Sequence, residues 1–188
     1  MDILAIDVET TGIIPGKHSL IEVAAIYIPE KGSTKWYNFL QPPNKAVNLG
    51  ALKYNNYRIT NFLDMNNVQP KTNFGGFIDF LLDIPKESIL LGHNVNFDID
   101  FLKAECENYN IESLWEILPK HKQDTKVIAN FLIQCGMLQA PNTTLTGLAE
   151  ALKIKYDHTK LHRADYDIEL TVEVYKVLKN LISSYANG

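Results

Sequence analysis

The sequence has little of several features that mark particular classes of protein. It carries only two cysteines, Cys106 and Cys135, in segments that read as helices with apolar neighbours, which favours buried thiols over a disulfide or a zinc site. No apolar stretch approaches the roughly 18 residues that a membrane span needs. The N-terminus lacks a basic segment followed by an apolar run, which is the pattern of a signal peptide. We therefore expect a protein without membrane attachment, in a reducing cytoplasm.

A strong excess of charge of one sign is also missing. The 18 basic and 22 acidic residues give a formal net charge of −4, without the basic excess of proteins that coat DNA or RNA. Chemistry on nucleic acid at a metal site is compatible with this balance, because bound cations reverse the local charge. A length of 188 residues suits one domain, which we expect over residues 1–183, followed by a short C-terminal tail at 184–188.

Hydrophobic patterning predicts an α/β domain with a mixed sheet. Strands are expected over residues 2–9, 20–29, 33–43 and 88–94, where short apolar runs end at turn residues. Helices are expected over residues 49–53, 72–82, 97–110, 124–135, 144–153 and 164–183. Three strands followed by a strand among helices indicate a sheet whose first three strands form a meander.

Two aspartates fall on helix faces that should be buried. At about 100° of rotation per residue, Asp98 lies near the middle of the apolar arc of helix 97–110, whereas Asp100 lies on the opposite side. Asp167 likewise falls within the apolar face of helix 164–183. A carboxylate directed at a core is costly unless it is paired or binds a metal, so Asp98 and Asp167 each need a partner.

A second pair of acids ends the first predicted strand. Asp7 and Glu9 are two residues apart, so their side chains point to the same side of a strand. Taken alone, Asp7 and Glu9 are equally well explained by an exposed strand end. A single aspartate that points inward from a helix is explained by a helix cap or by a buried ion pair. The chain has only two arginines, Arg58 and Arg163, so a cation explains four inward acids more simply. Ligation by carboxylate oxygens alone suits magnesium or manganese rather than zinc.

These acids belong to three motifs that resemble one known family. D-x-E-T-T-G matches at residues 7–12, H-N-x-x-F-D at 93–98, and H-x-A-x-x-D at 162–167. In this order and on these elements, the motifs resemble the DEDDh exonucleases, which include the proofreading subunit of bacterial DNA polymerase III and ribonuclease T. The resemblance spans most of the chain. It implies an RNase H-like fold, with a central mixed five-stranded sheet flanked by helices.

The resemblance also implies a metal-dependent 3′–5′ exonuclease, which hydrolyses single-stranded nucleic acid to nucleoside 5′-monophosphates. Two divalent cations, Mg²⁺ or Mn²⁺, would stabilise the attacking and leaving oxygens, held by Asp7, Glu9, Asp98 and Asp167. His162 would be the general base, since an unperturbed pKa of about 6.5 suits removal of a proton from water at neutral pH.

Other residues take supporting roles in this interpretation. His158 competes with His162 for the role of base but lies outside the motif, while His93 and Asp124 are interpreted as a structural hydrogen-bonding residue and a helix N-cap. Substrate contacts are expected from Thr10, Thr11, Asn94, Phe97, Asn55 and Tyr57. Asn55 and Tyr57 stand where many members of the family carry His-Gly-Ile or Asn-Gly-Ile. In those members an apolar side chain of this segment wedges the terminal base. Tyr57 therefore either stacks on a base or belongs to a surface turn.

Several alternatives stay open at the level of the sequence. The same fold could be a catalytically silent subunit that binds nucleic acid or protein, although all five catalytic positions are filled. DNA is the favoured substrate, with RNA or very short oligonucleotides as alternatives, because one or two contacts to the 2′-hydroxyl decide between them. The chain could also belong to a larger assembly with a protein partner from another chain, and its oligomeric state is open.

Overall fold

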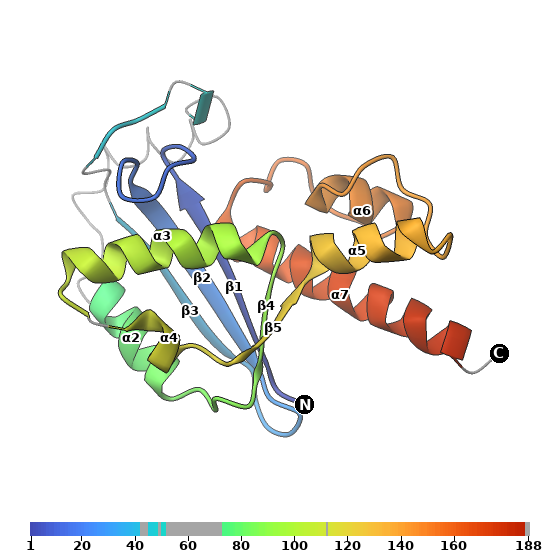
Figure 1. Ribbon diagram of the computed structural model, residues 1–188, viewed down its shortest axis with the longest axis horizontal. Coiled ribbons are helices and arrows are strands. Elements are labelled where there is room, and N and C mark those ends of the chain that lie inside the picture. Colours follow the sequence, from blue (N-terminus) through green and yellow to red (C-terminus); the bar gives the residue numbers. More distant parts are fainter. Residues whose placement is uncertain (42–44, 49, 52–72, 112, 187–188) are drawn as a thin grey trace.

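The computed structural model, which describes residues 1–41, 45–48, 50–51, 73–111 and 113–186, contains a five-stranded sheet with the order β3-β2-β1-β4-β5. The strands are β1 Ile3–Thr10, β2 Leu20–Ile28, β3 Lys35–Leu40, β4 Ile89–Gly92 and β5 His121–Asp124. The first three pair antiparallel, whereas β4 pairs parallel with both β1 and β5. The predicted mixed sheet and its meander are therefore confirmed (Figure 1).

Helices cover both faces of this sheet, with α3 in front of the strands and α7 behind them in Figure 1. They are α2 Phe74–Leu82, α3 Val95–Asn108, α4 Leu114–Ile117, α5 Thr125–Gln134, α6 Leu145–Ala151 and α7 Ala164–Ala186. Apolar side chains of α2, α3 and α4 pack with the even-numbered residues of β1, namely Leu4, Ile6 and Val8. The start of α7 packs on the opposite face, against Ala5, Ala24 and Ile26. Its later turns pack with α5 and α6.

Several details differ from the sequence prediction. β5 has the polar sequence HKQD and α4 spans only four residues, so neither has a hydrophobic period that reveals it. Cys135 is exposed at the end of α5, so its predicted burial is wrong, whereas Cys106 is buried as expected. α7 continues to Ala186, beyond its predicted end at residue 183. The helix predicted near residues 49–53 lies mostly outside the described residues.

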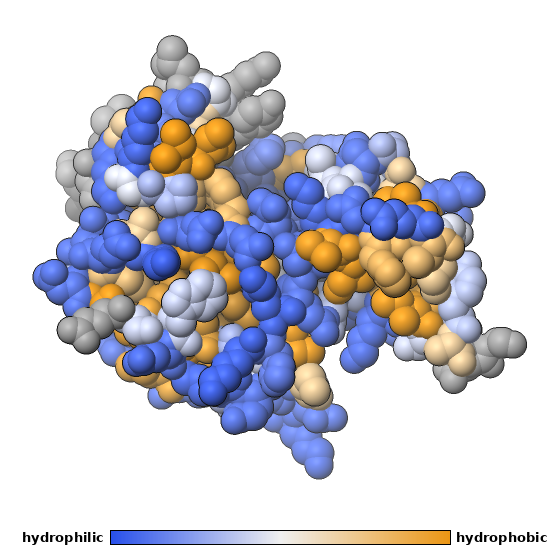
Figure 2. All heavy atoms as spheres, in the orientation of Figure 1, coloured by the Kyte–Doolittle hydropathy of each residue, from blue (hydrophilic) through white to orange (hydrophobic). Residues whose placement is uncertain are grey.

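Among the described residues, no helix has the length and hydrophobicity to cross a membrane. On the face shown in Figure 2, apolar side chains are interspersed with hydrophilic ones, and the molecule is hollowed near the top of the view. A hollow lined by Glu9 and Thr10 opens at the C-terminal end of β1. This end of the sheet is where the predicted catalytic motifs gather.

Candidate active site

The C-terminal half of β1 directs two acids toward the face of the sheet that α7 covers. Asp7 and Glu9 alternate with Val8, which packs into the core on the other face. In the antiparallel register, Glu9 lies opposite Glu22 of β2, which is fully buried. Because directly opposed residues point to the same face, three carboxylates share this end of the sheet.

α3 and α7 each bring one aspartate to the same place. Asp98, in the first turn of α3, is 4% exposed, and its Oδ1 accepts the backbone N–H of Val8 at 3.1 Å. Asp167, in the first turn of α7, accepts the backbone N–H of His162 on Oδ2 at 3.0 Å. Oδ1 of Asp167 is buried and has no hydrogen-bond partner within the described part of the chain. Asp100 is exposed, as its helix angle predicts.

Burial and mutual repulsion raise the pKa values of these acids. The pKa of Asp7 is raised well above its usual value, first by burial and then by repulsion from Asp98, Glu9, Asp167 and Glu22. Burial is also the main cause that raises the pKa of Asp98 well above its usual range and that of Asp167 from 3.8 to about 7. Like charges gathered in a partly desolvated pocket are electrostatically suited to a bound cation.

His162 completes a group of three potential metal ligands. One ligand atom from each of Glu9, His162 and Asp167 lies within 4.8 Å of the other two, which is close enough for one divalent ion to contact all three. His162 has a φ of 62°, in the left-handed region where a residue other than glycine is uncommon. Desolvation of the ring lowers the pKa of His162. The loop before α7 therefore places an imidazole beside the acids.

Two hollows border this histidine. The larger has a volume of about 550 Å³, and its lining includes Glu9, Phe97, His162 and the exposed Ile13. The smaller has a volume of about 430 Å³ and is lined by His162 and Asp167 together with residues of α6 and of the 156–161 segment. A ligand in either hollow would therefore lie beside the imidazole and at least one acid.

The two threonines of the first motif differ in their placement. Thr10 lines the larger hollow, and its hydroxyl donates to the carbonyl of Gly12 at 2.6 Å. Thr11 is fully buried; its hydroxyl donates to the carbonyl of Ala46 at 2.7 Å and accepts the N–H of Ser19 at 2.8 Å. The Thr11 side chain therefore holds the loop in place, and its predicted substrate contact does not follow from this arrangement.

Asn94 and Phe97 lie at the start of α3. Phe97 lines the larger hollow, whereas Asn94 is exposed and is not part of that lining. Asn94 has a φ of 68°, a left-handed conformation that asparagine tolerates better than most residues. Its visible role is therefore to begin the helix that carries Asp98. Asn55 and Tyr57 lie outside the described residues.

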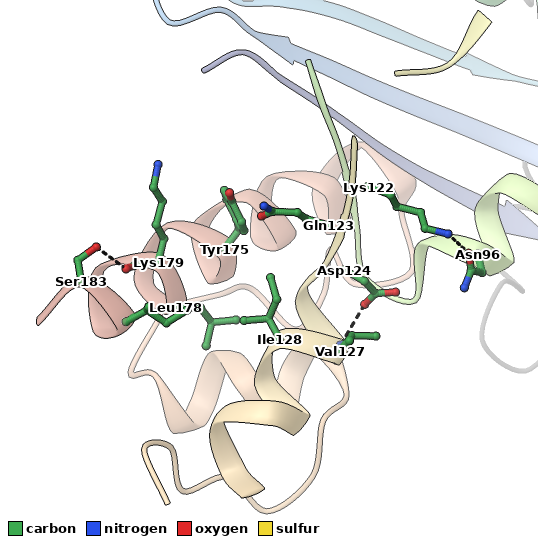
Figure 3. Close-up of a pocket in the computed structure, with 11 residues that line it drawn as sticks. Asn96, Lys122, Gln123, Asp124, Val127, Ile128, Tyr175, Leu178, Lys179 and Ser183 are labelled. Atoms are coloured by element: carbon green, nitrogen blue, oxygen red, sulfur yellow. Dashed lines mark hydrogen bonds between the residues drawn. The ribbon is translucent and has the colours of Figure 1, made fainter. Parts of the chain in front are cut away.

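Asp124 is a helix N-cap, as predicted. Its Oδ1 accepts the N–H groups of Lys126 and Val127 at the start of α5, and its Oδ2 accepts that of Val95 at 2.9 Å at the start of α3. One carboxylate thus fixes the first turns of two helices, including the turn that contains Asp98. Figure 3 shows Asp124 in the wall of a separate hollow of about 550 Å³, between β5, α5 and α7, which is lined by none of the predicted site residues that the structure describes.

His93 has the structural role that its position predicts. Its Nδ1 lies 2.8 Å from Oγ1 of Thr125, at the first residue of α5. Burial is the main cause that lowers the pKa of His93 to about 4, so the ring is neutral at pH 7. His93 therefore joins β4 to α5 and is poorly suited to accept a proton.

Glu22 and Ile13 are among the residues at this site that lie outside the three motifs. Glu22 is an acid in the otherwise apolar strand LIEVAAIYI, a signal that could have drawn attention to it. Ile13 is 75% exposed and directly follows the glycine of the first motif. An apolar residue in that position of a loop is a signal for a ligand contact, but a weak one.

The fold is of the RNase H-like class, and in this chain acids from several elements meet at the end of the central strand. The sequence profile of a family described as "Exonuclease" matches residues 4–175. The chain belongs to this exonuclease family, and the predicted enzyme class, a 3′–5′ exonuclease, is confirmed.

Relatives with similar sequences include DNA polymerase III proteins. The chain is 30% identical over 184 residues to DNA polymerase III subunit epsilon of Buchnera aphidicola, which covers 93% of this chain and 71% of that protein. It is 26% identical over 176 residues to DNA polymerase III PolC-type of Ureaplasma parvum, covering 93% of this chain and 11% of that protein.

Solved structures support the fold. The crystal structure of E. coli Exonuclease I in complex with a dT13 oligonucleotide superposes with a TM-score of 0.73 at 17% identity, over 99% of this chain and 42% of that chain. At this identity the likeness concerns the fold alone. The chain thus spans less than half the length of Exonuclease I and about a tenth of the PolC-type polymerase.

Proposed function

We propose that this chain removes nucleotides from the 3′ end of single-stranded nucleic acid, with DNA as the favoured substrate and RNA as the alternative. The observation that carries the proposal is the convergence, beside an open hollow, of Asp7, Glu9, Asp98, Asp167 and His162. The names of the relatives as DNA polymerase III subunits and the dT13 oligonucleotide in the Exonuclease I structure support DNA.

Two divalent cations, Mg²⁺ or Mn²⁺, are proposed for the acid cluster. The donor set fits them, because Oδ1 of Asp167 is buried without a hydrogen-bond partner among the described residues, and such an oxygen is costly unless a cation or donor satisfies it. The residues that would hold the ions are Asp7, Glu9, Asp98 and Asp167. When bound, such a pair stabilises the charge on the attacking and leaving oxygens of a phosphodiester.

The side chains around the cluster bind the substrate and move a proton. His162 accepts a proton from the attacking water at a ring nitrogen, and its lowered pKa keeps the ring in the neutral, accepting form at pH 7. The water oxygen bonds to phosphorus while the bond from phosphorus to the 3′ oxygen breaks, and that oxygen takes a proton from solvent. The products are a nucleoside 5′-monophosphate and a shortened strand. The terminal nucleotide occupies the larger hollow, with Ile13 and Phe97 against its base.

Digestion of matched oligonucleotides tests this function. DNA and RNA of one sequence, 5′-labelled, single-stranded and double-stranded, are incubated with Mg²⁺ or Mn²⁺ and, in parallel, with EDTA. We expect single-stranded DNA to shorten stepwise from its 3′ end, RNA to shorten more slowly, and EDTA to stop both. Folded protein that cuts no substrate with either cation would contradict the proposal and support the silent binding subunit.

We also propose that the chain works with a protein partner. The support is that its relatives are named as subunits of DNA polymerase III. Light scattering of the purified chain, alone and with the polymerase subunit of its own organism, measures both oligomeric state and association. The cytoplasmic location stays a prediction.

A further inference from the structure

We propose that Glu22 is a positioning residue that sets the start of α7, and with it Asp167 and His162, against the acids of β1. This inference rests on the proposed function of the site and adds a residue that lies outside its three motifs. Glu22 is fully buried in β2. A buried carboxylate is costly unless specific contacts offset its desolvation, and one contact of Glu22 indicates what it does.

Glu22 joins two elements that are distant in the sequence. Its side chain lies on the same face as that of Glu9, its partner in the antiparallel register. Its Oε2 accepts the backbone N–H of Ala164, the first residue of α7, at 3.3 Å and across 142 positions of sequence. The first N–H groups of a helix have no partner within the helix. Because Ala164 is itself fully buried, its N–H needs an acceptor from the protein, and a carboxylate is the acceptor that the helix dipole favours.

Ala164 lies between the two groups whose placement depends on it. His162 precedes it by two residues, and Asp167 follows it by three and accepts the N–H of His162 at 3.0 Å. The start of α7 is thus held together by its own hydrogen bonds, and Glu22 connects it to β2. Any shift of this turn along the sheet would separate His162 and Asp167 from Glu9, whose ligand atoms now lie within 4.8 Å of theirs.

For holding the start of α7, the reach of the Glu22 side chain matters more than its charge. Repulsion from Glu22 helps to raise the pKa values of Asp7 and Asp167, so its charge opposes their ionisation. Glutamine would remove this repulsion and keep an oxygen that can accept the N–H of Ala164. Aspartate would keep the charge but withdraw the carboxylate by one C–C bond, about 1.5 Å, beyond hydrogen-bond reach.

The test therefore compares Glu22→Gln with Glu22→Asp. We expect Glu22→Gln to keep kcat and Mn²⁺ affinity close to wild type, and Glu22→Asp to lose about 10–100-fold in both, with KM changed less than kcat. Glu105→Asp is the matched control, because Glu105 is a buried glutamate of α3 that hydrogen-bonds Gln41 and Asn108, none of which lines either hollow beside His162. The proposal would be overturned if Glu22→Gln lost kcat and Mn²⁺ affinity while Glu22→Asp kept them. It would also be overturned if the two variants lost these quantities equally, or if neither variant lost them.

A measurement on the metal-free protein separates this proposal from the function on which it rests. In EDTA, the amide hydrogen of Ala164 should exchange slowly in wild type and Glu22→Gln, and faster in Glu22→Asp. This result, with calorimetric titration of Mn²⁺, decides the role of Glu22 even if the chain cuts no oligonucleotide. Rapid exchange at Ala164 in wild type would overturn the proposal. Should Glu22→Asp fail to fold, a loss of Mn²⁺ affinity in Glu22→Gln would overturn it as well.

Discussion

The backbone N–H of His162 donates to Oδ2 of Asp167 at 3.0 Å, which joins the first and last residues of one sequence motif. On a single continuous helix, residues five positions apart would point about 140° away from each other. The structure avoids this because α7 begins at Ala164, so His162 precedes the helix and adopts a left-handed conformation. The bond uses the backbone of His162 and not its ring, and the ring lies beside Glu9.

Replacement of His162 by alanine should slow hydrolysis by about 10²–10⁴-fold, because the attacking water loses its base. Mn²⁺ affinity should change little, since the carboxylates provide most of the binding. Rates on a 5′-labelled single strand and calorimetric titration of Mn²⁺ measure the two effects. His158→Ala is the control from the same loop and should keep the wild-type rate. A slow His158→Ala variant beside a wild-type rate in His162→Ala would assign the role of base to His158. The centroid of the His158 ring lies 4.5 Å from that of Tyr156.

Replacement of Asp7 by alanine should reduce turnover to the background rate without unfolding the protein. Asp7 is the acid whose pKa is raised by burial and by four acidic neighbours, so its removal deprives the ions of a ligand and relieves repulsion in the metal-free state. The melting temperature in EDTA should therefore stay equal or rise. Asp100→Ala, which removes an exposed acid from α3, should change neither quantity. Cleavage by Asp7→Ala at the wild-type rate would show that the ligand assignment is wrong.

The metal-free protein should lose stability through Asp167 as the pH rises toward neutrality. Burial raises the pKa of Asp167 from 3.8 to about 7, so between these values the folded state binds a proton that the unfolded state does not. This contribution to stability is fully present below about pH 3.8 and is lost as the pH rises through about 7. The Asp167→Asn variant has no ionisable group at this position, so it lacks this pH-dependent contribution to stability.

Melting temperatures in EDTA, measured from about pH 4 to pH 8, check the effect of Asp167. The wild-type value minus the Asp167→Asn value should fall steadily over this range. His93, whose pKa is lowered to about 4 by burial, changes stability in the opposite direction, but it is present in both proteins and cancels in the difference. A difference that stays constant with pH would show that Asp167 carries no perturbed pKa.

The sequence predicts the direction of individual side chains well, because helix and strand geometry are local properties. The helix angle separates Asp98, which is buried, from Asp100, which is exposed two residues later. Strand alternation places Asp7 and Glu9 on one face, and the structure has them there. Local geometry also predicts Asp124 as a cap, since an aspartate directly before an apolar helical pattern is the usual signal.

Features that depend on distant partners could not be predicted in this way. β5 is a strand because its backbone pairs with β4, and its four polar residues carry no signal of that pairing. The sequence shows Glu22 as an acid in a strand, but its partner Ala164 is 142 positions away. Thr11 belongs to a motif, yet its hydroxyl is engaged by Ala46 and Ser19, two contacts that only the folded loop creates.

Replacement of Asp124 by alanine should destabilise the protein more than replacement of an ordinary helix cap. Asn73 is the matched control, because its Oδ1 accepts the N–H of Gly76 at 2.9 Å and caps α2 alone. Loss of a single cap costs about 1 kcal/mol, so we expect that value for Asn73→Ala. Asp124 serves both α5 and α3, so its loss should cost about twice as much. Urea unfolding in EDTA measures both values.

The two cap variants should also differ in metal binding. α3 begins at the N–H that Asp124 holds and carries Asp98 in its first turn, so fraying of this turn would move an acid of the cluster. Mn²⁺ affinity should therefore fall in Asp124→Ala and stay unchanged in Asn73→Ala, whose helix does not contribute to the site. Calorimetric titration, at a temperature where both variants are folded, makes the comparison. If both variants lost equal stability and kept wild-type Mn²⁺ affinity, the bond from Asp124 to α3 would have no part in placing Asp98.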